Sequence, residues 1–166
     1  EQYFLEWKDY SKDSSALEVD SEFEKYANEN KTTFNPYIDK QVFGLLNKTN
    51  FIDLITNFIV FETRENLTVK KIARYQQFRA VNKIVERVVS GEMKSGLIWH
   101  TQGSGKSLTM LFTSWKLRTL PQLNNPTILI VVDRIDLDEQ ISGTFGAVKL
   151  PNTTRANSIE GLKKKL

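Results

Sequence analysis

The chain has 166 residues, of which 40% are hydrophobic and 26% charged, enough for one modest globular domain with a hydrophobic core. It contains no cysteine, which excludes disulfides and thiolate metal sites and weakly favours the reducing cytoplasm. No apolar run approaches the roughly 20 residues of a membrane-spanning helix, and the first residues lack a signal-peptide pattern, so we expect no membrane partner.

The net charge of +3 is unevenly divided along the chain. Residues 1–66 hold 7 basic and 13 acidic residues, a net of −6, whereas residues 67–166 hold 16 and 7, a net of +9. The basic half suits polyanionic partners such as nucleotides and nucleic acid. The alternative is that the lysines, for example those at residues 163–165, only solvate helix faces.

The first 66 residues are predicted to be mostly helical. Residues 2–7 have the pattern of a short strand, and residues 8–35 form a polar surface connection with one helix near residues 19–28. Asn35 and Pro36 open another helical segment, because proline suits the first turn of a helix.

Residues 50–62 predict a packed amphipathic helix with Asn50 as its N-cap. Residues 64–66 are expected to form a loop, where we place the boundary between two regions. The apolar face of the predicted helix is formed by Phe51, Leu54, Ile55, Phe58 and Ile59.

Residues 67–166 predict alternating helices and strands. Apolar residues recur at helical spacing through residues 75–90, and residues 97–101 and 127–133 are apolar runs typical of buried strands. This order predicts an α/β fold in which the two runs are neighbouring or near-neighbouring parallel strands. We also expect a helix after Ser107, a short helix over residues 136–144, a loop at residues 152–156 and a final helix from Ser158 to Leu166.

The turn between the first strand and its helix has the residues of a phosphate-binding loop. Gly103 and Gly105 let the backbone N–H groups converge, and the following helix adds the positive end of its dipole. Lys106 would reach phosphate oxygens, and Ser107 would ligate Mg²⁺. His100 stands where the general phosphate-loop pattern has glycine. The alternative is a glycine turn that only joins a core strand to a helix.

Two further stretches carry candidate functional residues. Gln76 and Gln77 stand at a helix start beside aromatic and arginine side chains, and a glutamine amide matches the donor and acceptor edge of adenine; the alternative is a surface helix start. Asp133 ends the second apolar run like a Walker B aspartate, but Arg134 follows it instead of glutamate. A phosphate or DNA-backbone contact by Arg134, or a structural Asp–Arg pair, therefore remains open.

One residue triplet and one histidine are weaker candidates. Glu6, Trp7 and Lys8 match the tail of a nuclease metal-site pattern, but no upstream aspartate completes it in this chain. His100, the only histidine, is expected to be a strand-end residue rather than a catalyst.

Three stretches together resemble the restriction (R) subunit of type I restriction–modification enzymes: residues 74–81, 96–107 and 131–140. They are similar to that family's adenine-recognition motif, motif I and motif Ia. The amino-acid sequence of residues 100–107 also resembles the family's own version of motif I. Residues 51–62 resemble the helix that precedes the family's motor. The resemblance implies a partial RecA-like P-loop domain with a parallel sheet over residues 67–166, truncated before Walker B. It also implies a mostly helical region over residues 1–66 that connects a nuclease domain to this motor.

The resemblance also implies site residues and partners. Lys106 would be catalytic, Ser107 would bind Mg²⁺, Gln77 would read adenine, and Asp133 and Arg134 would lie near DNA. ATP would be hydrolysed to translocate and cleave double-stranded DNA in a prokaryotic cytoplasm, together with methyltransferase and specificity subunits. The remaining ATP contacts would come from the loop residues Thr101, Gln102, Gly103, Ser104 and Gly105.

We expect this chain on its own to be inactive as an ATPase. The family's Asp-Glu motif and arginine finger would lie beyond Leu166 and its nuclease carboxylates before Glu1, and such a finger contributes roughly 10³–10⁵ in rate. Alternatives are a nucleotide-dependent binding module, another superfamily 2 ATPase, or a small P-loop kinase, for which neither an arginine-bearing lid nor an acceptor site is visible.

Overall fold

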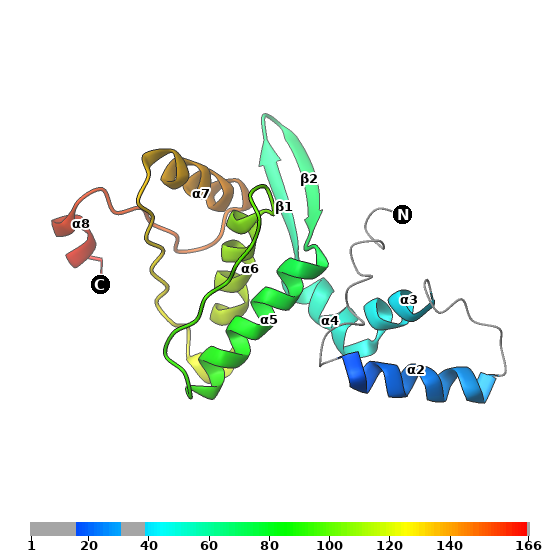
Figure 1. Ribbon diagram of the computed structural model, residues 1–166. Coiled ribbons are helices and arrows are strands. Elements are labelled where there is room, and N and C mark those ends of the chain that lie inside the picture. Colours follow the sequence, from blue (N-terminus) through cyan, green and yellow to red (C-terminus); the bar gives the residue numbers. More distant parts are fainter. Residues whose placement is uncertain (1–15, 31–38, 166) are drawn as a thin grey trace.

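The computed structural model describes residues 16–30 and 39–165 (Figure 1). The strand expected at residues 2–7, the Glu6–Lys8 triplet and the helix start at Asn35 and Pro36 lie outside the described residues.

The described residues form helices around one two-stranded sheet. Figure 1 shows α5 and α6 crossing at the centre, the β1–β2 hairpin standing at their upper end, α7 on one side and α2 to α4 on the other. The elements are α2 (Ala16–Asn30), α3 (Asp39–Leu46), α4 (Lys48–Asn57), β1 (Ile59–Arg64), β2 (Leu67–Ile72), α5 (Tyr75–Ser90), α6 (Lys106–Thr119), the short 3₁₀ helix η2 (Pro121–Leu123), α7 (Ile135–Val148) and α8 (Ile159–Lys163).

Several helices agree with the sequence prediction. The helix near residues 19–28 is confirmed as part of α2, and the helix at residues 75–90 is confirmed as α5, which ends at Gly91 with a φ of +67°. A helix after the glycine turn is confirmed as α6. The predicted helix at residues 136–144 is real but extends over all of α7. Ser158 caps α8, which ends at Lys163.

The predicted helix over residues 50–62 is wrong at both ends. α4 starts earlier, because Asn47 is its N-cap and its side chain accepts a hydrogen bond from the Thr49 N–H. Asn50 lies inside the helix and donates to the Gly44 carbonyl instead. α4 ends at Asn57, and the β-branched run that follows forms β1 because a neighbouring segment is available to pair with it.

β1 and β2 form an antiparallel hairpin in which Ile59 pairs with Ile72 and Arg64 with Leu67. Glu65 and Asn66 make the two-residue turn, with φ values of +46° and +67°, the left-handed pair that matches the twist of hairpin strands. The boundary placed after residue 66 therefore falls at the tip of this hairpin.

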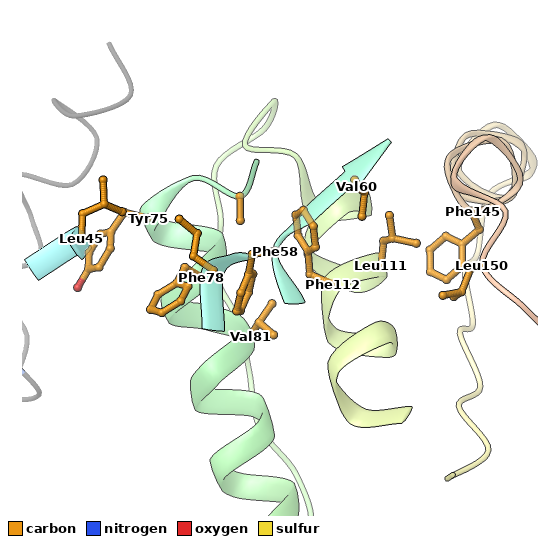
Figure 2. Packing of buried hydrophobic residues seen from close by; sticks show 12 residues of the cluster. Leu45, Phe58, Val60, Tyr75, Phe78, Val81, Leu111, Phe112, Phe145 and Leu150 are labelled. Carbon is orange, nitrogen blue, oxygen red and sulfur yellow. The ribbon is translucent and has the colours of Figure 1, made fainter. Parts of the chain in front are cut away.

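A single hydrophobic cluster joins residues on both sides of the hairpin (Figure 2). Phe58 lies at its centre, fully buried, with ring centroids 4.8 Å from Phe78 of α5 and 5.6 Å from Phe112 of α6. Leu45 of α3 and Phe145 of α7 belong to the same cluster. The helices before the hairpin and those after it are therefore packed as one body.

A largely buried polar network stabilises the same helices. Lys116 of α6 donates to both carboxylate oxygens of Asp53 in α4, each at 2.6 Å, and to the Asn82 amide oxygen of α5, also at 2.6 Å. Its ammonium lies 5.2 Å from the centroid of the Phe58 ring. Separating the helices would leave the largely buried Lys116 or Asp53 charge without its partner, which would lower the stability of the fold. The network therefore holds α4, α5 and α6 against one another.

The parallel sheet predicted from residues 97–101 and 127–133 is not present among the described residues, whose one sheet is the β1–β2 hairpin. Both segments lack ladder hydrogen bonds, and Leu97, Trp99 and Val131 are 88%, 86% and 80% exposed. An apolar run becomes a buried parallel strand only when other strands flank it and other elements cover both faces. The described residues supply neither.

Phe58→Ala should lower the free energy of unfolding by about 3–5 kcal/mol, because it empties the centre of the cluster. Phe61→Ala is the matched control, since that ring is 58% exposed on β1 and should cost far less. Urea unfolding followed by tryptophan fluorescence measures both. Equal destabilisation would contradict the central position of Phe58.

Candidate nucleotide-binding site

The loop between His100 and α6 is shaped by two glycines in the left-handed region. Gly103 has a φ of +78°, and Gly105, the N-cap of α6, has a φ of +80°. The Ser104 N–H donates to the Thr101 carbonyl. In the described part of the chain, the N–H groups of Gly103, Gly105, Lys106 and Ser107 have no acceptor. Free N–H groups at a helix N-terminus are suited to binding an anion.

Lys106 begins α6 and folds its side chain back over this loop. Its ammonium donates to the carbonyl oxygens of Thr101 at 2.9 Å and His100 at 3.2 Å. Both acceptors are neutral and the side chain is exposed. Phosphate oxygens are stronger acceptors for an ammonium group than carbonyls, so an incoming phosphate can replace them.

Two hydroxyl groups complete the loop. Ser107 Oγ, in the first turn of α6, accepts a hydrogen bond of 3.3 Å from Gln140 Nε2 of α7. Ser104 is 5% exposed, and its Oγ has no hydrogen-bond partner among the described residues. Hydroxyl oxygens are suitable Mg²⁺ ligands, so Ser107 fits the metal site predicted from the sequence.

Gln77 lies directly behind the loop and is 2% exposed. Its Oε1 accepts from the Arg74 N–H at 2.9 Å, and its Nε2 donates to the carbonyls of Ser104 at 3.3 Å and Gly105 at 3.1 Å. Both the oxygen and the nitrogen of the amide therefore have partners within the protein. Reading adenine would require Gln77 to exchange at least one of these partners, while the neighbouring Gln76 is exposed.

Gly105 is required for two separate reasons. Its φ of +80° strains any side chain, and a Cβ atom there would lie 2.6 Å from Gln77 Nε2. Gly103 has a similar φ, but a Cβ atom there would have no neighbour within 4 Å. Both glycines are favoured by their positive φ, but only at Gly105 would a side chain also collide with Gln77.

His100 is partly buried, and its Nδ1 has no hydrogen-bond partner in the described part of the chain. Burial, and then the nearby Lys106 ammonium, hold the pKa of His100 below its ordinary value. The imidazole is therefore neutral at pH 7, and the Lys106 ammonium is a formal positive charge at the loop.

Asp133 and Arg134 are exposed just before α7. Arg134 pairs with Asp136 rather than with Asp133, and its Nε lies 3.1 Å from the Asp136 carboxylate. The hydrogen bond from Arg134 and then its charge lower the pKa of Asp136. A DNA phosphate at Arg134 would have to compete with this carboxylate.

An open groove of about 990 Å³ runs along the exposed side of α5, between that helix and residues 93–100. The sequence does not predict that residues 93–100 lie opposite α5, because no local pattern shows where an irregular segment runs. Gln140 ends the segment 131–140 that resembles motif Ia, and the sequence assigns it no role. The cationic side chains of the groove are Arg74, Arg79, Lys83, Arg87 and Lys94.

Residues 16–30 and 39–165 contain no group of three or more His, Asp or Glu side chains able to hold a metal ion. None of the helices among them is long and apolar enough to cross a membrane.

Comparison with known proteins confirms the resemblance seen in the sequence. Residues 76–166 match a family described as SWI2/SNF2 ATPase. The chain is 38% identical to the type I restriction enzyme HindI endonuclease subunit of Haemophilus influenzae, over 89% of this chain and 13% of that subunit. It is 34% identical to the putative type I restriction enzyme MjaIXP endonuclease subunit of Methanocaldococcus jannaschii, over 96% and 16%. The chain thus spans a small part of these relatives, and no solved structure matches it.

Gly105→Ala should destabilise the protein more than Gly103→Ala. Both variants carry the cost of a left-handed alanine, roughly 1–2 kcal/mol, but only Gly105→Ala also collides with Gln77. In urea unfolding, the Gly105→Ala, Gln77→Ala double variant should lose less stability than the sum of the two single losses, because the collision is absent without the Gln77 side chain. Additive effects would mean that the two residues do not touch.

The single histidine permits a direct test of the loop electrostatics by NMR titration of its ring. His100 should titrate below about 6.5, the value of an unperturbed histidine. Lys106→Ala should raise this pKa but leave it below 6.5, because burial is the larger cause. Because the folded pKa is lowered, the contribution of His100 to stability is complete above 6.5 and is lost as the pH falls toward the folded pKa. A pKa above 6.5 in the folded protein would contradict this geometry.

Proposed function

Because the chain belongs to the SWI2/SNF2 ATPase family, we propose that it is the ATP-binding part of the DNA-translocating motor in a type I restriction endonuclease subunit. The observation that carries this proposal is the loop at the N-terminus of α6. There, two left-handed glycines, N–H groups without acceptors and a movable lysine ammonium converge.

In this proposal the triphosphate of ATP binds in the loop of residues 101–107, where the N–H groups of Gly103, Gly105, Lys106 and Ser107 have no other acceptor. Lys106 leaves the carbonyls of His100 and Thr101 to contact phosphate oxygens, and it is the catalytic residue because it stabilises negative charge that grows toward the transition state. Ser107 would hold Mg²⁺, which would further neutralise the phosphate charge. The N–H groups without acceptors and the Lys106 ammonium fit the phosphates, and the Ser107 hydroxyl fits the metal.

The adenine end of the nucleotide is assigned to the start of α5. Gln77 bonds the carbonyls of the phosphate loop, and the three residues before it, Arg74, Tyr75 and Gln76, line the groove along α5. Gln77 is proposed to contact adenine by exchanging one of its loop carbonyls for the base. Gln77 thus keeps the adenine-reading role that the sequence suggested. Because it also bonds the phosphate loop, it would link base binding to phosphate binding.

DNA is proposed to contact the segment that precedes α7. Asp133 and Arg134 are exposed there, and residues 67–166 carry a net charge of +9 (16 basic against 7 acidic). In the whole protein, ATP hydrolysis would drive movement and cleavage of double-stranded DNA. That protein would work in a prokaryotic cytoplasm together with methyltransferase and specificity subunits.

Residues 97–101 and 127–133 are proposed to become parallel strands of a RecA-like motor domain in the longer protein. Their exposed apolar side chains, such as Leu97 and Val131, support this, because such side chains are normally covered. Residues 1–66 would then form the region that connects the motor to a nuclease domain, and residues 67–166 would form the first part of the motor.

Lys106→Ala in the full-length subunit should lower DNA-dependent ATP hydrolysis at least about 100-fold, the effect of removing one transition-state contact. Translocation-dependent DNA cleavage should be lost with it. Lys163→Ala, an exposed lysine in α8, is the control and should behave as the wild type. An unchanged hydrolysis rate in Lys106→Ala would leave the loop as a structural turn.

Gln77→Ala should weaken ATP binding and reduce the preference for ATP over GTP. Loss of one hydrogen-bonded partner of this kind costs roughly 1–3 kcal/mol. Hydrolysis measured against the concentration of each nucleotide gives the preference, with Gln76→Ala as the matched control. If Gln77→Ala weakens ATP and GTP equally, Gln77 supports only the loop; if Gln76→Ala alone changes the preference, Gln76 reads the base.

A further inference from the structure

α7 reaches the phosphate loop through one side chain. Gln140, in the second turn of α7, donates its Nε2 hydrogen to Ser107 Oγ at 3.3 Å, across 33 positions of sequence. This is the one hydrogen bond that the structure records for the Gln140 side chain. Ser107 is also the residue proposed to ligate Mg²⁺.

The chemistry of a hydroxyl allows both contacts at once. A serine oxygen has one proton and two lone pairs. When Gln140 occupies one lone pair, the side-chain torsion of Ser107 is restricted, but the second lone pair remains for a metal and the proton for an anionic acceptor. Mg²⁺ demands near-ideal octahedral geometry and takes few protein ligands, so the orientation of one hydroxyl matters for its binding.

The Gln140 amide is presented by a helix that is held on both sides of it. Asp138, two residues earlier, forms an ion pair with Arg155, and Phe145, five residues later, is 5% exposed in the hydrophobic cluster. The backbone position of Gln140 is therefore set by the packing of α7. From that position its exposed amide reaches Ser107 Oγ and can restrict the orientation of the hydroxyl.

We propose that Gln140 is a positioning residue that orients the Ser107 hydroxyl for Mg²⁺. This rests on the proposed ATP-binding function and deepens it, because it adds a residue from α7 to the metal side of the site. Gln140 contacts neither nucleotide nor metal; it acts through Ser107.

The test measures nucleotide affinity in the full-length subunit with a fluorescent ATP analogue, once with Mg²⁺ and once with EDTA. Gln140→Leu should reduce the gain in affinity that Mg²⁺ provides by roughly two- to tenfold, the worth of one hydrogen bond. The Kd in EDTA should not change. Gln122→Leu, the same substitution at an exposed site in η2, is the control and should keep the full gain.

A second variant keeps the proposal falsifiable. In a Ser107→Ala background, Gln140→Leu should have no further effect on the Mg²⁺-dependent gain, since the group it orients is gone. A gain that Gln140→Leu leaves intact, a further loss in the Ser107→Ala background, or an equal loss of affinity with and without Mg²⁺ would each overturn the positioning role. Failure of the proposed function itself looks different, because the wild type would then bind no nucleotide under either condition.

Discussion

The buried amide of Gln77 is the interaction on which the candidate site depends. Two of its three hydrogen bonds join the start of α5 to the carbonyls of Ser104 and Gly105, and the third is accepted from the Arg74 N–H. A buried amide left without partners is costly, so the loop and α5 hold each other in place. The same contact explains why Gly105 has no room for a side chain. A nucleotide that displaces Gln77 from one carbonyl would therefore change the loop at the same time.

The hydrophobic cluster fixes α5, which carries Gln77, against the other helices. α5 is fixed against α6 through Phe78, Phe58 and Phe112, and Phe58 comes from the segment before the hairpin. Lys116 adds a polar link between α4, α5 and α6. Motion of the phosphate loop relative to α4 would disturb a continuous packed core. The residues before the hairpin are thus part of the structural support of the site.

How much of this follows from sequence depends on how local each signal is. The helix at residues 75–90 and the loop at Gly103 to Ser107 follow from local spacing, and both are present. Ile59 to Phe61 continue an apolar helical pattern, so only their pairing with residues 70–72 shows that they form a strand. The hydrogen bonds of Gln77 and Gln140 span 27 and 33 positions and have no local signature. The parallel strands need neighbouring strands, and a short apolar run cannot show whether these are present.

The proposed function depends on phosphate binding by the N–H groups of Gly103, Gly105, Lys106 and Ser107. Amide hydrogen exchange of the full-length subunit tests it most directly, with and without Mg²⁺ and a non-hydrolysable ATP analogue. Binding should slow exchange at residues 103–107 and leave the turn at Glu65 and Asn66 unchanged. Equal exchange at residues 103–107 under saturating nucleotide, or slowing confined to other segments, would contradict the assignment of this loop as the phosphate site.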